Sequence, residues 1–327
     1  MKINEYKIGD NRELLKEVES NTVDLIYIDP PYCTGRDFYH FDDRFNSSAD
    51  YRELLLRPMF EECHRILTDV GNIVIHVEAK ISHHVRIVLD DIFGEKKFKN
   101  EIVWVSGGNH KSKYQLQRNH DTIIVYQKGK ESIYNAEHKQ YDTETVKKAK
   151  ICKVRKKKYN TSALVNRQPN VVSRPNLRYK WNGNDLQWHV SKERMQMLHD
   201  DNRLEYSPNT GIPRVKKYLD EMDGIPVKDV WNDIKQIQGV EKLDYATQKP
   251  VALLNRILKM FSNEGSIVLD ACAGSGTVGR SAILTNRNYI LFDLNTDGKI
   301  LFEKSIETLV PVEEVSQNPL ESALYAL

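Results

Sequence analysis

The stretch from Val23 to Tyr32 constrains this chain most, because an apolar run of strand type ends there in an aspartate, two prolines and a tyrosine. Each proline fixes its own φ at about −65°, lacks an N–H and disfavours helix in the residue before it. Asp29 and Pro30 are therefore held extended. The stiff loop presents two fixed acceptors, the Asp29 carboxylate and the Pro30 carbonyl, beside the flat ring of Tyr32. Such a site suits an amino group.

A second signature lies in Ile267–Gly279, where a buried-type strand breaks into a glycine loop that opens a helix. Gly274 and Gly276 let the backbone turn tightly and approach a ligand, and the helix N-terminus offers free N–H groups to an anion. Asp293 lies about 20 residues further on, at the end of the next predicted strand, where a carboxylate can bind both hydroxyls of a ribose. The pattern indicates a cofactor site.

The glycine spacing also allows a different enzyme class. Gly274-x-Gly276-x-x-Gly279 satisfies the dinucleotide fingerprint, so a nicotinamide oxidoreductase is an alternative. Only a short tail follows Asp293, which is too little to complete a dinucleotide fold. The alternative is therefore disfavoured.

A one-signed charge run separates the two signatures. Between Lys147 and Lys180 the chain carries twelve lysines and arginines and no acidic residue, with Tyr159, Tyr179 and Trp181 interleaved or adjacent. Cations combined with aromatic rings are the footprint of a nucleic-acid surface, and a disordered solvated linker is the alternative. The DNA contacts are predicted at Lys156, Lys157, Lys158, Arg174 and Arg178.

The composition of 327 residues, 40% hydrophobic and 29% charged, permits one large α/β domain with a substantial insertion. Strand patterns at 72–77, 101–105 and 121–126 alternate with helical patterns at 51–66 and 81–93, which implies parallel βαβ units. Pro58 is expected to kink the first of these helices, and Pro250 suits the first position of a helix at 251–261. Four cysteines without CxxC spacing and the lack of a long apolar run fit a soluble cytoplasmic protein without metal.

Three motifs now carry a family resemblance. Asp29-Pro30-Pro31-Tyr32 resembles the DPPY motif of DNA methyltransferases that modify exocyclic amino groups. Asp270-Ala-Cys-Ala-Gly-Ser-Gly-Thr277 resembles their S-adenosylmethionine loop, and Tyr245-Ala-Thr-Gln-Lys-Pro250 resembles the motif that closes around the methionine part of the cofactor. The order of the catalytic loop, the basic recognition region and the cofactor loop corresponds to the circularly permuted β-type arrangement of these enzymes.

The resemblance implies a doubly wound, mostly parallel, Rossmann-like sheet of the seven-stranded methyltransferase type. Residues 1–135 would form the catalytic half, 136–244 an inserted target-recognition region, and 245–327 the cofactor half. The chain departs from many relatives at Asp270-Ala-Cys, where they have Asp-Pro-Phe. The implied catalytic residues are Asp29, Pro30, Pro31 and Tyr32, and the implied cofactor contacts are Asp10, Thr247, Lys249, Pro250, Asp270, Ala271, Cys272, Gly274, Ser275, Gly276, Thr277 and Asp293.

The expected activity is transfer of a methyl group from S-adenosylmethionine to the amino group of a flipped-out adenine in double-stranded DNA. Adenine is favoured because the motif begins with Asp, whereas cytosine-directed members usually begin with Ser. Alternatives are a cytosine amino-methyltransferase, an RNA or protein-glutamine methyltransferase, or a DNA-binding protein that has lost catalysis. The resemblance further implies association with the nucleoid, a cognate restriction endonuclease or a solitary or phage role, and homodimers as in many relatives.

Overall fold

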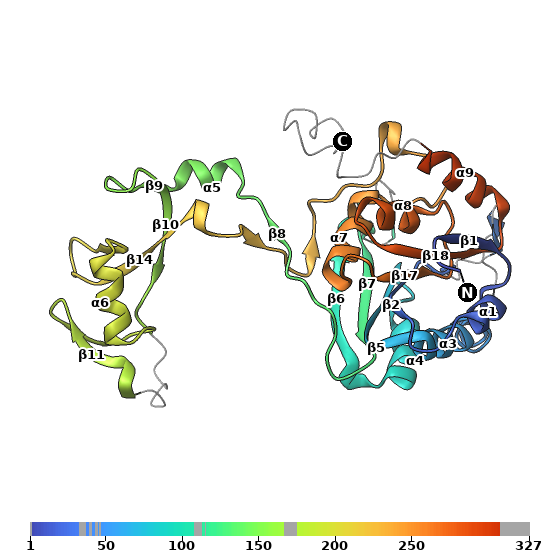
Figure 1. Cartoon of the computed structure of the whole chain (residues 1–327), viewed down its shortest axis with the longest axis horizontal. Helices are drawn as coiled ribbons and strands as arrows, with labels where there is room; N and C mark the ends of the chain where they lie inside the picture. The colour runs from blue at the N-terminus through green and yellow to red at the C-terminus, as the bar shows by residue number, and fades with distance from the viewer. Residues whose placement is uncertain are drawn as a thin grey trace. The chain divides into compact units, whose positions relative to one another are not determined.

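The computed structural model describes residues 2–32, 37–38, 41–42, 45, 47–107, 113–114, 116–166 and 175–307. Its contacts divide the chain into two units, a larger one formed by Met1–Glu137 and Lys228–Leu327 and a smaller one formed by His138–Val227 (Figure 1). Arg174, one of the predicted DNA contacts, lies outside the described residues. In the segment that follows Tyr32, residues 33–36, 39–40, 43–44 and 46 also lie outside them.

The expected second boundary of the insertion, residue 244, is wrong. Residues 228–244 belong to the larger unit, because β16 (Val230–Trp231) pairs with β6 (Phe98–Trp104) at the edge of its main sheet. The indole Nε1 of Trp104 also donates to the carbonyl of Ile234 at 2.9 Å. These contacts are made by residues far apart in sequence, so the local pattern did not reveal them.

The larger unit is built on an eight-stranded sheet in the order β1-β18-β17-β2-β5-β7-β6-β16. The first five strands are mutually parallel, and β16 is parallel to β6. In contrast, β7 runs antiparallel to both of its neighbours, so the expected alternation of parallel units fails there. A helix connects β5 to β6, whereas the described residues between β6 and β7 contain none, which fits an antiparallel return. The remaining bounds are β1 (Glu5–Ile8), β18 (Asn288–Asp293), β17 (Ile267–Asp270), β2 (Val23–Ile28), β5 (Leu67–Glu78) and β7 (Asp121–Gln127).

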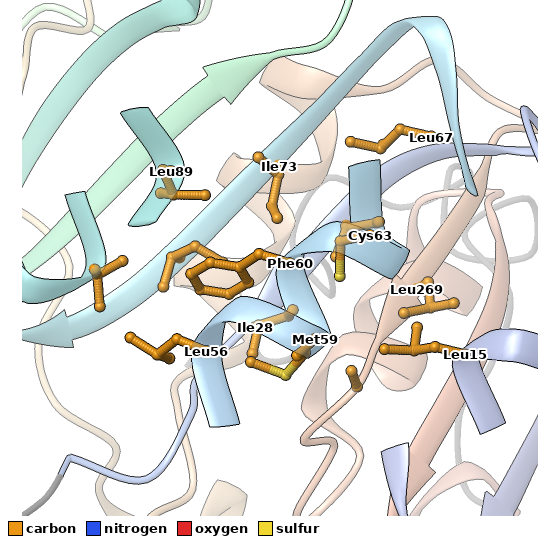
Figure 2. Close-up of a cluster of buried hydrophobic side chains, with 14 of the residues drawn as sticks. Leu15, Ile28, Leu56, Met59, Phe60, Cys63, Leu67, Ile73, Leu89 and Leu269 are labelled. Carbon is orange, nitrogen blue, oxygen red and sulfur yellow. The ribbon is translucent and has the colours of Figure 1, made fainter. Parts of the chain in front are cut away.

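Helices cover both faces of this sheet, as a doubly wound fold requires (Figure 1). On one face, Met59, Phe60 and Cys63 pack against Ile28 and Ile73 (Figure 2). The helices α7 and α8 pack against each other, and α8 packs on β18. The helices of this unit are α1 (Asn11–Leu14), α2 (Ser48–Asp50), α3 (Arg57–Ile66), α4 (Ser82–Phe93), α7 (Val251–Phe261), α8 (Thr277–Leu284) and α9 (Thr296–Ile306), with 3-10 turns at Leu15–Glu17, Glu95–Lys97 and Gly239–Glu241 and a short strand pair, β3 (Asp37–Phe38) and β4 (Phe41–Asp42).

The predicted position of Pro250 needs correction, whereas the kink expected at Pro58 stays a prediction. Pro58 lies in the first turn of α3, directly after a π-helical segment at Tyr51–Leu56, where its missing N–H breaks no bond of α3. Pro250 is the N-cap of α7 with φ −64° and ψ 136°, one position before the first helical residue. Pro250 thus marks a helix start, whereas Pro58 lies where a continuous helical stretch passes from the π-helical segment into α3.

The smaller unit has its own antiparallel sheet in the order β13-β14-β10-β9 and its own apolar core. That core contains Leu164, Trp188, Met195, Leu198 and Leu204. Among the described residues of the whole chain, no helix is long and apolar enough to cross a membrane. The elements are β8 (His138–Lys139), α5 (Thr143–Lys148), β9 (Lys150–Ile151), β10 (Lys158–Ala163), β11 (Arg178–Trp181), β12 (Asn184–Gln187), α6 (Lys192–Asp200), β13 (Leu204–Tyr206), β14 (Pro213–Tyr218) and β15 (Ile225–Pro226), with 3-10 turns at Pro175–Leu177 and Leu219–Glu221.

Candidate active site

Each of the five neighbouring parallel strands is followed by or ends in an acidic residue at the same edge of the sheet. These carboxylates line a single pocket of about 900 Å³. Open α/β sheets bind their ligands at this edge, outside the carboxyl ends of the strands. The acidic residues are Asp10 after β1, Asp293 in β18, Asp270 in β17, Asp29 after β2 and Glu78 in β5.

The pocket brings together most residues that the sequence predicted for the two sites. Of the cofactor candidates, Pro250 and Gly276 are outside the lining. The predicted residues that line the pocket are Asp10, Asp29, Pro30, Pro31, Tyr32, Thr247, Lys249, Asp270, Ala271, Cys272, Gly274, Ser275, Thr277 and Asp293.

The loop after β2 is fixed by its own side chains. The Tyr32 hydroxyl donates a hydrogen bond to one oxygen of the Asp29 carboxylate. The hydroxyl of Tyr51 donates to the Pro31 carbonyl at 2.8 Å, which anchors the loop to the π-helical segment. Within the described part of the chain, no N–H or O–H group donates to the Pro30 carbonyl. That oxygen is therefore available to a ligand as an acceptor.

Lys249 lies between the predicted catalytic and cofactor motifs. Its ammonium group forms an ion pair with the second oxygen of Asp29 and donates to the Tyr32 hydroxyl at 3.1 Å. The side chains of Lys249 and Asp29 are only 14% and 17% exposed. The sequence assigned Lys249 to the cofactor alone, whereas the structure joins it to the catalytic loop.

The two glycines of the cofactor loop have different roles. Gly274 has φ 52°, its N–H donates to Asp293 Oδ2 at 2.8 Å, and its carbonyl accepts from the Tyr6 hydroxyl at 2.6 Å. Gly276 has φ 72° and caps α8, and a Cβ there would lie 2.5 Å from Phe302 Cδ2. Gly276 is thus needed for the backbone turn and for packing against α9, and its expected approach to a ligand stays a prediction.

Two of the predicted acidic contacts already have partners inside the protein. Asp293 also accepts from the Asn295 N–H at 2.9 Å, so its carboxylate shapes the glycine loop. Asp10 caps α1 and accepts from Arg12 Nε at 2.9 Å and Nη2 at 2.5 Å. The Arg12 hydrogen bond lowers the pKa of Asp10. Arg12 lines the pocket as well, so this end of the site presents an ion pair.

Asp270 ends β17, and Cys272 lies two residues further on, in the loop that lines the pocket. Burial raises the pKa of the Asp270 carboxyl well above its usual range, and its Oδ1 accepts from the Cys272 N–H at 2.9 Å. Burial likewise raises the pKa of the Cys272 thiol, which argues against a nucleophilic cysteine. Asn11 fixes this loop by donating to the Ala271 carbonyl at 2.9 Å.

A buried polar chain behind the pocket was missed from the sequence. The Tyr27 hydroxyl lies 2.9 Å from His76 Nδ1, and His76 Nε2 lies 3.3 Å from Asp121 Oδ2. Burial and then Lys249 lower the pKa of His76 below its usual value, so the ring is neutral near pH 7. Tyr27 lines the pocket. Tyr27 and His76 lie within otherwise apolar strands. Polar side chains in such a strand were the sequence signal that could have indicated a buried hydrogen-bonded chain.

The basic run of the smaller unit is partly neutralised in space, which corrects the expectation of one-signed charge. Lys157 pairs with Asp220 at 2.5 Å, and Arg178 lies 3.7 Å from Asp185. Lys158 donates to the Val146 carbonyl at 3.2 Å, which satisfies one N–H but does not neutralise its charge. Lys148, Lys150 and Arg155 likewise pair with Glu144, Glu205 and Asp201.

Two other cations of this run, Lys153 and Lys156, have no carboxylate partner among the described residues. In the part of the chain that the structure describes, no carboxylate lies within 4.0 Å of Lys153 or Lys156. Lys156 has φ 57° at a turn that returns its N–H to the Cys152 carbonyl at 2.8 Å. The positive charges of these two lysines are therefore not paired with a described carboxylate, as the sequence predicted for a nucleic-acid surface.

No group of three or more His, Cys, Asp or Glu side chains among the described residues could hold a metal ion.

Residues 23–302 match the model of a protein family described as DNA methylase. The chain is 28% identical over 310 residues to the Type II methyltransferase M.EcaI of Enterobacter cloacae, a match that covers 89% of this chain and 66% of the relative.

Two further comparisons show a likeness in sequence and a likeness in fold. The chain is 26% identical to the DNA adenine methyltransferase YhdJ of Escherichia coli, over 88% of this chain and 78% of the relative. Among solved structures, a complex of M1.HpyAVI with SAM is similar with a TM-score of 0.50 and 16% identity, covering 93% of this chain and 99% of that one. The chain spans just under two thirds of the length of M.EcaI.

Proposed function

Because the chain belongs to the DNA methylase family, we propose that it transfers a methyl group from S-adenosylmethionine to the exocyclic amino group of an adenine in duplex DNA. One observation carries the proposal: the Asp29-Pro30-Pro31-Tyr32 loop and the glycine loop of Gly274 open into the same pocket. A methyl donor and an amino acceptor can therefore meet there. The other parts of the proposal follow from the chemistry of that pocket.

The pocket fits S-adenosylmethionine. The first turn of α8 leaves amide groups without partners inside the helix, and Ser275, Thr277 and Val278 line the pocket beside them, which suits the amino-acid carboxylate. The acidic strand ends suit a ligand that also carries positive charge. When bound, the cofactor supplies an electrophilic methyl group on a sulfonium sulfur.

The acceptors of the loop after β2 would activate the amino group. An exocyclic amine is a weak nucleophile because its lone pair is delocalised into the ring. Hydrogen bonds from its two N–H groups to Asp29 and to the Pro30 carbonyl favour a pyramidal nitrogen. They also stabilise the positive charge that grows on nitrogen during transfer. The methylated nitrogen is strongly acidic and then loses its proton to Asp29 or to water.

The target base cannot reach this pocket from inside a duplex, so it must be flipped out of the stack. The ring of Tyr32 lines the pocket beside Asp29 and offers a stacking surface for the base. The smaller unit, with the open charges of Lys153 and Lys156, is the proposed target-recognition region that binds the DNA backbone.

Adenine is the proposed target base. Both adenine and cytosine carry an amino group that two acceptors can bind, and the family model covers N6 and N4 transfer alike. The name of YhdJ, a DNA adenine methyltransferase, supports adenine. The carboxylate of Asp29 is also a stronger acceptor than the hydroxyl with which cytosine-directed motifs usually begin. Nucleoid association, homodimers and a partner restriction endonuclease are further proposals that follow from this activity.

The proposal is tested by incubating the protein with S-adenosylmethionine labelled in the methyl group and with duplex DNA of varied sequence. The DNA is digested to nucleosides, and the modified positions are mapped by sequencing. Label in N6-methyladenine is the expected result, and Asp29→Asn is the matched inactive control. Label in N4-methylcytosine alone would overturn the choice of base, and label in RNA or protein but not in DNA would overturn the substrate class.

A further inference from the structure

Lys249 connects the two halves of the pocket through a contact that neither predicted motif explains. It directly precedes Pro250 and α7, yet its ammonium group reaches across 220 residues of sequence to Asp29. The same group donates to the Tyr32 hydroxyl at 3.1 Å and lies 5.5 Å from the centre of the Tyr32 ring. One cation thus contacts both polar groups of the catalytic loop.

We propose that Lys249 is a positioning residue that couples cofactor binding to the availability of Asp29. The inference rests on the proposed function. Without cofactor, the ammonium group is shared between Asp29 and Tyr32. When the amino-acid carboxylate of S-adenosylmethionine enters the pocket, it draws the ammonium group towards itself. The Asp29 carboxylate is then released to accept the N–H of the target amino group.

The charges in the pocket require such an exchange. Positive charge develops on the amino nitrogen during transfer, and Asp29 is placed to stabilise it. A lysine bound to Asp29 offsets that stabilisation, because two cations then compete for one carboxylate in a site of reduced dielectric. An anion that takes up part of the Lys249 charge removes the competition. The charge of Lys249 therefore opposes the reaction until it has a second partner.

The amino-acid carboxylate is the anion best placed to be that partner. Among the described residues that line the pocket, Arg12 and Lys249 are the lysine and arginine side chains, and Arg12 is bound by Asp10 through two nitrogens. Lys249 has three N–H donors, of which Asp29 and Tyr32 account for two. Ser275 and Thr277, at the start of α8, line the same pocket. A carboxylate bound in that pocket would compete with Asp29 for the Lys249 ammonium group.

The coupling must be reciprocal, so it can be measured without DNA. Asp29 and the cofactor carboxylate compete for Lys249, and removing the charge of Asp29 must strengthen the binding of a ligand that carries the carboxylate. S-adenosylhomocysteine carries it, whereas 5′-methylthioadenosine has the same nucleoside and sulfur but lacks the amino acid. The two ligands separate a charge effect on Lys249 from a change in the nucleoside site.

The experiment is calorimetric titration of both ligands into the wild type, Asp29→Asn, Lys249→Met and the double variant. Asp29→Asn should bind S-adenosylhomocysteine about tenfold more tightly, within the range of measured site-to-site couplings, and 5′-methylthioadenosine equally well. Lys249→Met should weaken S-adenosylhomocysteine about tenfold and abolish the gain from Asp29→Asn in the double variant. Lys249→Arg should restore part of the affinity, since a guanidinium also binds a carboxylate.

Lys7→Met provides a matched control, because Lys7 forms an exposed pair with Glu17 outside the pocket and should leave both affinities unchanged. If Lys249→Met does not fold, the affinities of Asp29→Asn for the two ligands are sufficient to test the coupling. Equal affinity of wild type and Asp29→Asn for S-adenosylhomocysteine would overturn the coupling. Failure of the wild type to bind S-adenosylhomocysteine, or to transfer label to DNA, would instead overturn the proposed function.

Discussion

The hydroxyl of Tyr32 donates a hydrogen bond to the carboxylate of Asp29, three residues earlier in the same loop. Burial, and then the charge of Asp29, raise the pKa of Tyr32 well above its usual value, so the hydroxyl remains a donor. The side chain that is proposed to stack on the target base therefore also orients the group proposed to accept its N–H. The ring of Tyr32 would therefore contribute to stacking on the base, and its hydroxyl to the orientation of Asp29, and the two contributions can be separated by mutation.

Substitutions at Tyr32 should separate them. Tyr32→Phe keeps the ring but removes the bond to Asp29, and should slow methyl transfer about tenfold, as expected for a hydrogen bond to a charged group. Tyr32→Ala should in addition weaken capture of the base by about 1 to 3 kcal/mol. The rate is measured by single-turnover transfer of label, and base capture by fluorescence of a duplex with 2-aminopurine at the mapped target. Equal loss of base capture in Phe and Ala variants would contradict the stacking role.

Asp29→Ala should abolish most of the methyl transfer. Removing a group that stabilises developing charge costs at least about 100-fold in rate. The affinity for S-adenosylhomocysteine should not fall, because the carboxylate acts on the amino group of the base. Label transfer and calorimetry on the same preparation check both statements. A variant that turns over within a few-fold of the wild type would show that the loop after β2 is not catalytic.

Local sequence patterns were sufficient to predict those helix bounds and strand ends that are set by residues close in sequence. The helix at Val251–Phe261 agrees with its predicted bounds, and the helix that begins at Ser82 ends before Gly94, which has φ 91°. The strand ends at Asp29 and Asp270 were recognisable because proline and glycine interrupt an apolar run there. Parallel strands with crossover helices then bring such ends to one edge of the sheet.

Pairings between distant residues could not be predicted in this way. The ion pair of Lys249 with Asp29 joins positions that are separated by 220 residues, and nothing in either motif specifies it. Likewise Lys157 looked like an unpaired charge in a basic run, but folding brings to it Asp220, which lies in the 3-10 turn directly after β14. The direction of β7 was missed for a related reason, because a strand pattern gives no orientation.

These pairings change the expected response of the basic run to mutation. Replacing Lys153 and Lys156 by Gln should weaken DNA binding and reduce its salt dependence by up to about 0.9 per lost phosphate contact. Lys157→Gln should have a smaller effect, because Asp220 already neutralises that charge. Affinity is measured as a function of salt concentration on target and non-target duplexes. The ratio between the two duplexes should stay constant, since backbone contacts carry no sequence information.

Asp220→Asn is the complementary control, because it frees the charge of Lys157 and should strengthen DNA binding at low salt. If the double lysine variant keeps the wild-type salt slope, the stretch is not a DNA-binding surface. If Lys157→Gln weakens binding as much as the double variant, the ion pair with Asp220 does not persist when DNA binds.

Asp270 predicts a pH dependence of stability. Its pKa is raised by burial in the native state, whereas in the unfolded chain it lies at about 4. Between these two values the native state holds a proton that the unfolded state has lost, so the contribution of Asp270 to stability is present below about pH 4 and is lost as the pH rises towards the native pKa. Asp270→Asn removes the ionisation and keeps an oxygen that can accept from the Cys272 N–H. The variant should therefore be more stable than the wild type at pH 7.

Thermal unfolding of both proteins between pH 4 and pH 8 checks this prediction. The difference in the free energy of unfolding should be small near pH 4 and should increase as the pH rises, because only the wild type must either keep the proton on Asp270 or bury a charge. A gain of about 1 kcal/mol corresponds to a few degrees in Tm for a protein of this size. The same difference at every pH would mean that Asn improves packing without relieving a buried charge. A less stable variant at pH 7 would mean that the ionised Asp270 is favoured by the site, contrary to its burial beside Asp29 and Asp293.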